Sequence, residues 1–161
     1  MTMSPPVSLR PATPPDTEFL AAVYAATRMQ ELMATDWSAE QKAEFCQMQF
    51  TAQDAHYRRH YPTAEFSVIE VSGIPVGRLY VDRWPREIRI MDISVLPPHR
   101  GQGIGTNLLV GLQREATMTG RCLSIHVERF NPALQLYQRL GFQMTDDKGV
   151  YLLLEWTADL R

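Results

Sequence analysis

The stretch HRGQGIGT, residues 99–106, places three glycines at alternate positions behind an arginine. It follows an apolar run that ends at Val95, and it precedes a periodic apolar stretch that predicts a helix from about Ile104 to Thr119. The loop therefore joins the carboxyl end of a strand to the amino end of a helix. At that end the first N–H groups have no backbone partner and the helix dipole is positive.

The composition of the loop predicts an anion cradle. Gly101, Gly103 and Gly105 let the backbone turn tightly and approach a bound group, and Arg100 adds a forked donor that suits phosphate. Two familiar phosphate loops do not fit. No lysine is present for a GxxxxGK[ST] loop, and Thr106 stands where GxGxxG needs its third glycine. A glycine-rich turn that holds no ligand remains the alternative.

The rest of the chain predicts strands that alternate irregularly with helices. An antiparallel meander combined with helical crossovers indicates the α+β class, with a single mixed, mostly antiparallel sheet flanked by helices. The two strands on either side of helix 104–119 should run parallel. We expect one domain over residues 1–161, with residues 1–6 flexible. The expected strands are 7–10, 65–71, 75–82, 87–95, 122–127, 142–146 and 150–156, and the expected helices are 13–32, 37–61, 104–119 and 131–142.

Composition excludes several classes of protein. The 161 residues carry a formal net charge of −2, which gives no electrostatic footprint for nucleic acid. No apolar run reaches the ~20 residues that span a bilayer. The N-terminus lacks a secretory signal, and Cys46 and Cys122 are unrelated in spacing, so we expect a cytoplasmic protein with reduced thiols. His56 and His60 lie four residues apart without further ligands, so no metal site is expected.

Two motifs resemble those of the GCN5-related N-acetyltransferase (GNAT) family. HRGQGIGTNLL matches the signature R-x-x-G-x-G/A through Arg100, Gly103 and Gly105, with Gln102 between them. NPALQLYQRLGF resembles the family's second motif, an asparagine followed by a helix that bears a tyrosine and ends in Gly-Phe. The run IRIMDISVLPPHRG resembles the central strand that enters the loop. The order of elements also resembles that family's fold, the acyl-CoA N-acyltransferase fold, over essentially the whole chain.

The resemblance implies acetyl-CoA as cofactor and an amine as acceptor. In that family the diphosphate lies on the amides of the glycine loop, and the pantetheine arm pairs with the exposed edge of the central strand. A pantetheine amide can satisfy such an edge because it resembles a peptide. Asn131 reads as a helix N-cap, and a further cofactor contact there stays open. The implied cofactor contacts are Ile93, Val95, Arg100, Gly101, Gln102, Gly103, Ile104, Gly105, Thr106, Asn131 and Tyr137.

Tyr137 is the candidate acid. It occupies the position of the family's motif tyrosine, which implies that it protonates the departing CoA sulfur. Its phenol has an ordinary pKa of about 10, close to that of a thiol leaving group. A purely structural role is the alternative, because Tyr137 shares one arc of its helix with apolar neighbours: Ala133, Leu134, Leu136 and Leu140.

The sequence offers several candidates for the base that takes the proton of the amine. Glu87, at the start of the central strand, is the first candidate. Strict alternation along residues 87–95 puts Glu87, Ile93 and Val95 on one face and Asp92 on the other, unless a bulge breaks it. A water-borne proton path without a single base is also open. The other candidate bases are Asp92, His126 and Glu128. Glu87 also fits a solvated strand end, and Asp92 also fits a buried, hydrogen-bonded structural group.

The acceptor is expected to be a small-molecule or peptide amine, without nucleic acid or membrane as partner. A pocket is expected between the first two helices and the turn before the central strand, lined from Glu31, Asp36, Trp37, His56, Tyr57, Arg58, Arg59, His60, Tyr61, Arg83 and Trp84. A non-catalytic acyl-CoA-binding module that regulates a partner is the alternative function. The chain is expected to be a monomer or a homodimer. VYLLLEW, residues 150–156, is long and apolar for an edge strand and would suit a dimer contact.

Overall fold

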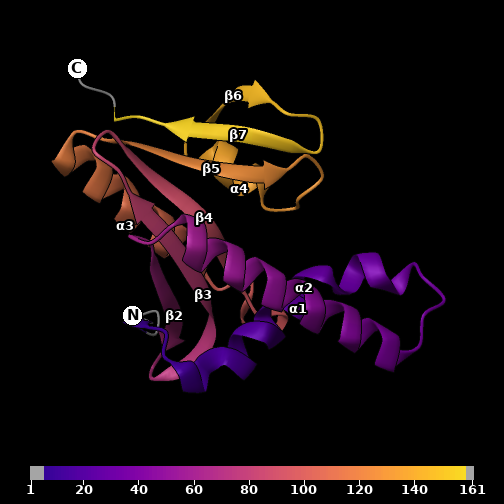
Figure 1. The fold of residues 1–161 in the computed structure, drawn as a ribbon. Coiled ribbons are helices and arrows are strands. Elements are labelled where there is room, and N and C mark those ends of the chain that lie inside the picture. Colours follow the sequence, from indigo (N-terminus) through magenta and orange to yellow (C-terminus); the bar gives the residue numbers. More distant parts are fainter. Residues whose placement is uncertain (1–5, 159–161) are drawn as a thin grey trace.

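The computed structural model describes residues 6–158 and builds them around one seven-stranded sheet (Figure 1). The strand order is β1-β2-β3-β4-β5-β7-β6. Every neighbouring pair is antiparallel except β4 and β5, which run parallel as predicted. The predicted fold class is therefore confirmed. The elements are β1 Val7–Pro11, α1 Thr17–Met33, α2 Ala39–His60, β2 Glu65–Val71, β3 Ile74–Arg83, β4 Glu87–Val95, α3 Ile104–Thr119, β5 Cys122–Glu128, α4 Leu134–Arg139, β6 Gln143–Asp147 and β7 Tyr151–Trp156.

Local sequence signals fix the helix ends. At the start of α2, Gln41 N donates to Ser38 Oγ at 3.1 Å and Ser38 N donates to Gln41 Oε1 at 2.9 Å, which forms a capping box. The last helix is shorter than the predicted range 131–142. Asn131 Oδ1 accepts from Ala133 N at 2.8 Å in a turn that precedes α4, and Gly141, at φ +95°, follows its last residue by two positions.

The two faces of the sheet are covered unequally. The helices α3 and α4 pack on one face over the main hydrophobic core, and α1 and α2 lie over the other face and extend as a hairpin beyond the sheet (Figure 1). Each fully buried aliphatic side chain contributes about 1.5–3 kcal/mol to stability. The sheet between the helix layers is thus rigid enough to position side chains that project from it. The most deeply buried apolar residues of the main core include Ile69, Val76, Ile88, Ile90, Leu109, Leu123 and Leu154.

A bulge in β4 changes which side chains share a face. Tyr80 on β3 is opposite Asp92, but the next residue, Val81, is opposite Ile90, so Met91 is an extra residue in β4. After the bulge, Ile93 packs against the α3–α4 core, on the same face as Ile90. Asp92, with Glu87 and Arg89 at the start of β4, points to the α1–α2 face. The strict alternation expected for residues 87–95 is therefore wrong after Ile90.

The C-terminal hairpin also differs from expectation. β7 lies inside the sheet between β5 and β6, so the apolar segment 150–156 is covered on both edges. The edge strand is β6, all five residues of which are exposed. The expected edge-to-edge dimer contact through VYLLLEW is therefore wrong. The flexibility expected of residues 1–6 concerns residues that, apart from Pro6, lie outside the described part of the chain. Among residues 6–158, no helix combines the length and apolar character that crossing a membrane requires.

Candidate active site

The parallel pair β4–β5 holds only over its first four residues. The ladder runs from Glu87, opposite Cys122, to Ile90, opposite Ile125, and ends there although both strands continue. From Met91 onward β4 is bonded to β3 alone, and the second half of β5 is bonded to β7 alone. Figure 1 shows the two strands diverging from this point. We call the opening between them the split.

The edge of β4 that faces the split presents the backbone of Ile93 and Val95. Leu96 N donates to Val76 O on β3 at 2.8 Å. Because backbone groups alternate in direction along a strand, Val95 and Ile93 direct their N–H and C=O groups away from β3 and into the split. A row of backbone groups without a strand partner is a template for an amide-bearing ligand.

The glycine loop lies at the end of β4 that opens into the split. Gly101 and Gly103 have φ of +76° and +80°, a left-handed conformation that other residues adopt at a cost. A Cβ added at either glycine would meet no atom within 4 Å, so this side of the loop is open. Among the described residues, the N–H groups from Gly101 to Thr106 meet no acceptor, and the first bond of this region is Asn107 N to Gly103 O, at 2.9 Å. Six unpaired donors therefore surround the helix start, as the sequence predicted for an anion cradle.

Arg100 and Gly105 have structural contacts as well. Arg100 Nε donates to Val95 O at 2.8 Å, which ties the loop to the end of β4 and leaves the two terminal nitrogens of the guanidinium for another partner. A Cβ added at Gly105 would lie 3.7 Å from Leu136 Cδ2, so this glycine sits where α3 approaches α4. Gln102 is exposed on the loop.

Tyr137 projects from α4 into the core and is 4% exposed. Its ring packs edge-on against Phe142, with centroids 5.7 Å apart. Its hydroxyl makes no hydrogen bond within residues 6–158. Burial raises the pKa of the Tyr137 phenol well above its ordinary value, and the negative charge of Asp92 raises it further. The phenol is therefore held protonated at any physiological pH, as a proton donor must be.

Asp92 belongs to a polar network with buried Arg78, in line with the alternative interpretation of Asp92 as a hydrogen-bonded structural group. Its carboxylate forms an ion pair with Arg78 of β3 through Arg78 Nε, and Ser94 Oγ donates to its Oδ1 at 3.0 Å. Arg78 is 2% exposed and also donates from Nη2 to Gln53 Oε1 at 2.9 Å. Both carboxylate oxygens of Asp92 are therefore occupied. The signal in the sequence is a lone arginine inside the apolar strand PVGRLYVD and a lone aspartate inside the neighbouring strand IRIMDIS.

Aromatic rings surround Arg78. The guanidinium lies 4.7 Å from the ring centroid of Tyr80 and 5.7 Å from that of Tyr24. Tyr57 of α2 meets Tyr80 edge-on at 6.0 Å, and burial, together with the charge of Asp92, raises the pKa of Tyr57 to about 12. Arg78 Nη1 and the Tyr80 hydroxyl are buried without a hydrogen-bond partner among the described residues.

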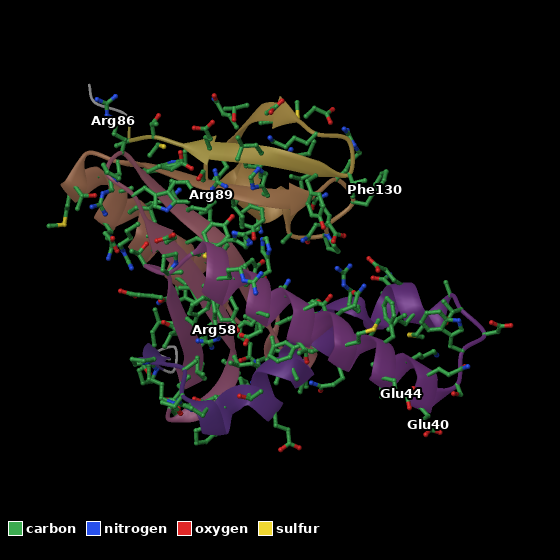
Figure 2. The ribbon with its side chains drawn as sticks, viewed as in Figure 1. Glu40, Glu44, Arg58, Arg86, Arg89 and Phe130 are labelled. Carbon is green, nitrogen blue, oxygen red and sulfur yellow. The ribbon has the colours of Figure 1, made fainter. Side chains whose placement is uncertain are left out.

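Glu87 lies in a second cluster, at the paired end of β4. Arg89 Nη2 donates to Glu87 Oε2 at 2.7 Å, and Ser124 Oγ donates to the same oxygen at 2.6 Å. The guanidinium of Arg89 also contacts His126 Nδ1 at 3.2 Å and lies 5.0 Å from the Trp84 ring (Figure 2). Because Arg89 is always a donor, His126 Nδ1 accepts, which places the ring proton on Nε2. Burial and the charge of Arg89 lower the pKa of His126.

The structure separates the residues that the sequence grouped in an acceptor pocket. Arg83 points to the α3 side, where its Nη2 donates to Glu115 Oε1 at 3.0 Å, so its expected place in the pocket is wrong. Asp36 and Trp37 lie at the tip of the α1–α2 hairpin, beyond the sheet (Figure 1). Glu31 instead lies near β5, because Arg28 Nη1 of α1 is 3.3 Å from its carboxylate and also reaches Glu128 of β5 at 3.6 Å.

Phe130 is a further candidate that sequence reasoning missed. It follows β5, is 91% exposed and precedes Asn131, so it lies on the loop at the far end of the split (Figure 2). No three His, Cys, Asp or Glu side chains of residues 6–158 come together as metal ligands.

A family model for the acetyltransferase (GNAT) domain matches residues 62–144, just over half of the chain. The chain belongs to the GNAT acetyltransferase family. The match includes β2 to α4, and therefore the glycine loop, the split and Tyr137 of this GNAT domain. The family and the enzyme class inferred from the two sequence motifs are thereby confirmed. No curated protein matched the chain.

Solved structures share the fold of this GNAT domain at low sequence identity. PaiA N-acetyltransferase from Thermoplasma acidophilum, in complex with coenzyme A, is 15% identical with a TM-score of 0.73, over 95% of this chain and 99% of that chain. Arabidopsis thaliana Naa50, with the bisubstrate analogue CoA-Ac-MVNAL, is 18% identical with a TM-score of 0.61, over 94% and 99%. YncA from Salmonella typhimurium, with acetyl-CoA, is 20% identical with a TM-score of 0.60, over 96% and 95%.

Proposed function

We propose that this GNAT domain transfers the acetyl group of acetyl-CoA to a primary amine by direct attack, without an acyl-enzyme step. One observation supports the proposal most directly: within residues 6–158, six unpaired N–H groups at the start of α3 adjoin a strand edge that no other strand pairs with. The complexes of PaiA and YncA with coenzyme A and acetyl-CoA support the choice of co-substrate. Neither cysteine favours an acyl-enzyme, because Cys46 is buried in α2 and burial raises the pKa of both thiols.

The residues present fit the chemistry of CoA. The N–H groups from Gly101 to Thr106 suit a diphosphate, and the free terminal nitrogens of Arg100 add positive charge beside them. The backbone of Ile93 in the split suits the amides of the pantetheine arm. Val95 offers its N–H, since its carbonyl already accepts from Arg100. Gln102 and Asn131 are the remaining proposed contacts, on the loop and before α4.

Tyr137 serves as the acid in this proposal. Bound acetyl-CoA supplies a thioester whose carbonyl carbon the amine attacks and whose sulfur leaves with an electron pair. The Tyr137 hydroxyl makes no hydrogen bond within residues 6–158, and it lies close enough to β4 for the charge of Asp92 to contribute to its raised pKa. It is therefore a proton donor available to that sulfur.

Glu87 serves as the base, through water. Both of its protein donors, Arg89 and Ser124, bind Oε2, so Oε1 remains free to accept a proton relayed from the amine. Asp92 is a poorer base because donors occupy both of its oxygens. His126 is also poorer, since its only unprotonated nitrogen faces Arg89. The charge of Asp92 instead adds to burial in raising the pKa of Tyr137.

The acceptor is proposed to be a small-molecule or peptide amine that enters from the α1–α2 side. Aromatic rings border this side at Tyr57 and Trp84, and Phe130 stands exposed at its far end. The peptide-bearing analogue bound to Naa50 supports a peptide amine as one option. The unpaired thiols of Cys46 and Cys122 support a reducing compartment such as the cytoplasm.

Two measurements on the full chain test the proposal. Calorimetric titration with acetyl-CoA should show binding that Gly103→Trp abolishes, because the larger side chain fills the open side of the loop. A panel of amines, assayed by release of free thiol, should then identify an acceptor. Binding of acetyl-CoA without turnover on any amine would favour the non-catalytic acyl-CoA-binding module. Absence of binding would overturn both functions.

A further inference from the structure

One exposed face of α2 combines opposite charges at its two ends. Glu44, Met48, Ala52, Ala55 and Arg59 follow at intervals of four, four, three and four residues, so they lie on one side of the helix. All five are exposed, and Met48 is 63% exposed. We call these residues the α2 stripe. It faces away from α1 and the sheet, because α2 turns Cys46 and Phe50 inward.

The charges of the α2 stripe have no partners in the described chain. Neither Glu44 nor Arg59 takes part in an ion pair within residues 6–158. Helical neighbours explain why: the positions four residues before and after Glu44 hold Glu40 and Met48, and Ala55 lies four before Arg59. Figure 2 shows Glu40 and Glu44 near the tip of the hairpin, far from the end of α2 that bears Arg59.

The order of residues in the α2 stripe is self-complementary. When two copies of α2 are laid antiparallel about a two-fold axis between Thr51 and Ala52, Glu44 of each copy falls opposite Arg59 of the other. The same operation puts Met48 opposite Ala55, a large side chain against a small one. In a two-fold dimer the same surface of each copy forms the interface, so that surface must be complementary to itself. The 16 residues from Glu44 to Arg59 extend over about 22 Å of helix axis.

A groove beside the α2 stripe fits the same arrangement. It is lined by Trp37, Gln41, Glu44, Phe45 and Met48 near the tip of the hairpin. The two-fold operation brings the last turn of the second copy's α2, with Arg59, over this groove. An arginine there would meet the carboxylate of Glu44 and the aromatic faces of Trp37 and Phe45.

We propose that two copies of this chain pair through the α2 stripe, with the two α2 helices antiparallel and Glu44 of each bound to Arg59 of the other. This interface replaces the contact through segment 150–156, which β6 covers. It is independent of the proposed enzymatic function, because neither the glycine loop nor the split contributes to it. It leaves the split open in both copies.

Charge reversal tests the proposal by sedimentation velocity over a dilution series. The native chain should be a dimer whose dissociation constant rises with salt. Glu44→Arg or Arg59→Glu alone should raise the dissociation constant of the dimer about tenfold or more. Each variant places like charges opposite each other at both of the symmetry-related contacts. The double variant should return to within about threefold of the native dimer, because the pair is restored in reverse. Glu18→Arg, an exposed reversal on α1, is the matched control and should have no effect.

A cross-linking experiment tests the position of the two-fold axis between Thr51 and Ala52. Ala52→Cys should form a disulfide with itself on mild oxidation, because the axis passes beside it, whereas Gln47→Cys and the native thiols should not. A chain that remains monomeric at millimolar concentration overturns the proposal. A dimer whose dissociation constant is unchanged by both single charge reversals would also overturn the proposal. So would a double variant that dimerises as weakly as the single variants. Circular dichroism of each variant checks that the fold persists.

Discussion

The carboxylate of Asp92 acts on the phenol of Tyr137 although the two side chains start from opposite faces of the sheet. Tyr137 lies in the core under α3 and α4, whereas Asp92 pairs with Arg78 on the α1–α2 side. The charge of Asp92 nevertheless adds to burial in raising the pKa of Tyr137. The split explains this, because beyond Ile90 no β5 backbone lies alongside β4. The bulge at Met91 turns Asp92 to its face and thereby helps set the acidity of the proposed proton donor.

Tyr137→Phe tests the acid. We expect kcat to fall roughly 100-fold, because the leaving sulfur loses its proton donor, while the affinity for acetyl-CoA changes less than about twofold. Tyr151→Phe, which removes an exposed hydroxyl from β7, is the matched control and should leave kcat unchanged. Because the pKa of Tyr137 is raised, the native enzyme should show no loss of kcat from tyrosine ionisation as the pH rises to 10. Unchanged turnover in Tyr137→Phe would leave the tyrosine a core residue only.

Gly103→Ala distinguishes a role of the glycine loop in binding acetyl-CoA from the effect of backbone strain on stability. Gly103 and Gly73 both have φ of +80° and open space where a Cβ would lie. Alanine at either position should therefore cost about 1 kcal/mol of stability, seen as a similar fall in Tm. Only Gly103→Ala should weaken acetyl-CoA binding, by about tenfold, because it disturbs donors to a charged group. Equal effects of the two variants on binding would contradict a ligand at the loop.

Arg78→Met tests the buried ion pair. Its removal leaves the carboxylate of Asp92 without its cation, which should cost about 3 kcal/mol in the free energy of unfolding, measured by urea denaturation. Arg58→Met removes the exposed pair with Asp54, at 3.1 Å, and should cost about 0.5 kcal/mol or less. Similar losses in both variants would show that the Arg78–Asp92 pair adds no more than a surface contact.

Arg89→Gln tests the electrostatics of the Glu87 cluster. Burial first, and then the positive charge of Arg89, lower the pKa of His126 below its ordinary value of 6.5. Removing that charge should move the pKa upward, as measured by NMR titration of the His126 ring. Arg86→Gln, an exposed change just before β4, should leave it in place. Since the folded pKa lies below the unfolded one, His126 contributes stability above pH 6.5 that is lost as the pH falls.

The elements that repeat a pattern were predictable from the sequence. The capping box at Ser38 and Gln41, the helix from Ile104 and the parallel pairing of β4 with β5 depend on local signals or on chain connectivity. The open, left-handed conformation of the glycine loop was predictable because its residue types have a direct conformational meaning.

The features that depend on the pairing of distant segments were not predictable from the sequence. The extra residue at Met91 arises from the pairing of β4 with β3. The alternation of residues along β4 alone holds no information about that pairing. The pairing of Arg78 with Asp92 and of Arg83 with Glu115 requires knowing which face each strand residue takes. β7 lies between β5 and β6, and this strand order is not encoded in the sequence of β7 itself. Its apolar residues fit an interior strand as well as an edge strand.

A crystal structure of the chain with coenzyme A would show where the cofactor binds. We expect the diphosphate on the N–H groups from Gly101 to Thr106, the pantetheine amides bonded to the backbone of Ile93, and the sulfur within hydrogen-bond reach of the Tyr137 hydroxyl. Coenzyme A bound elsewhere, with the loop empty and the split closed by side chains, would contradict the proposed function.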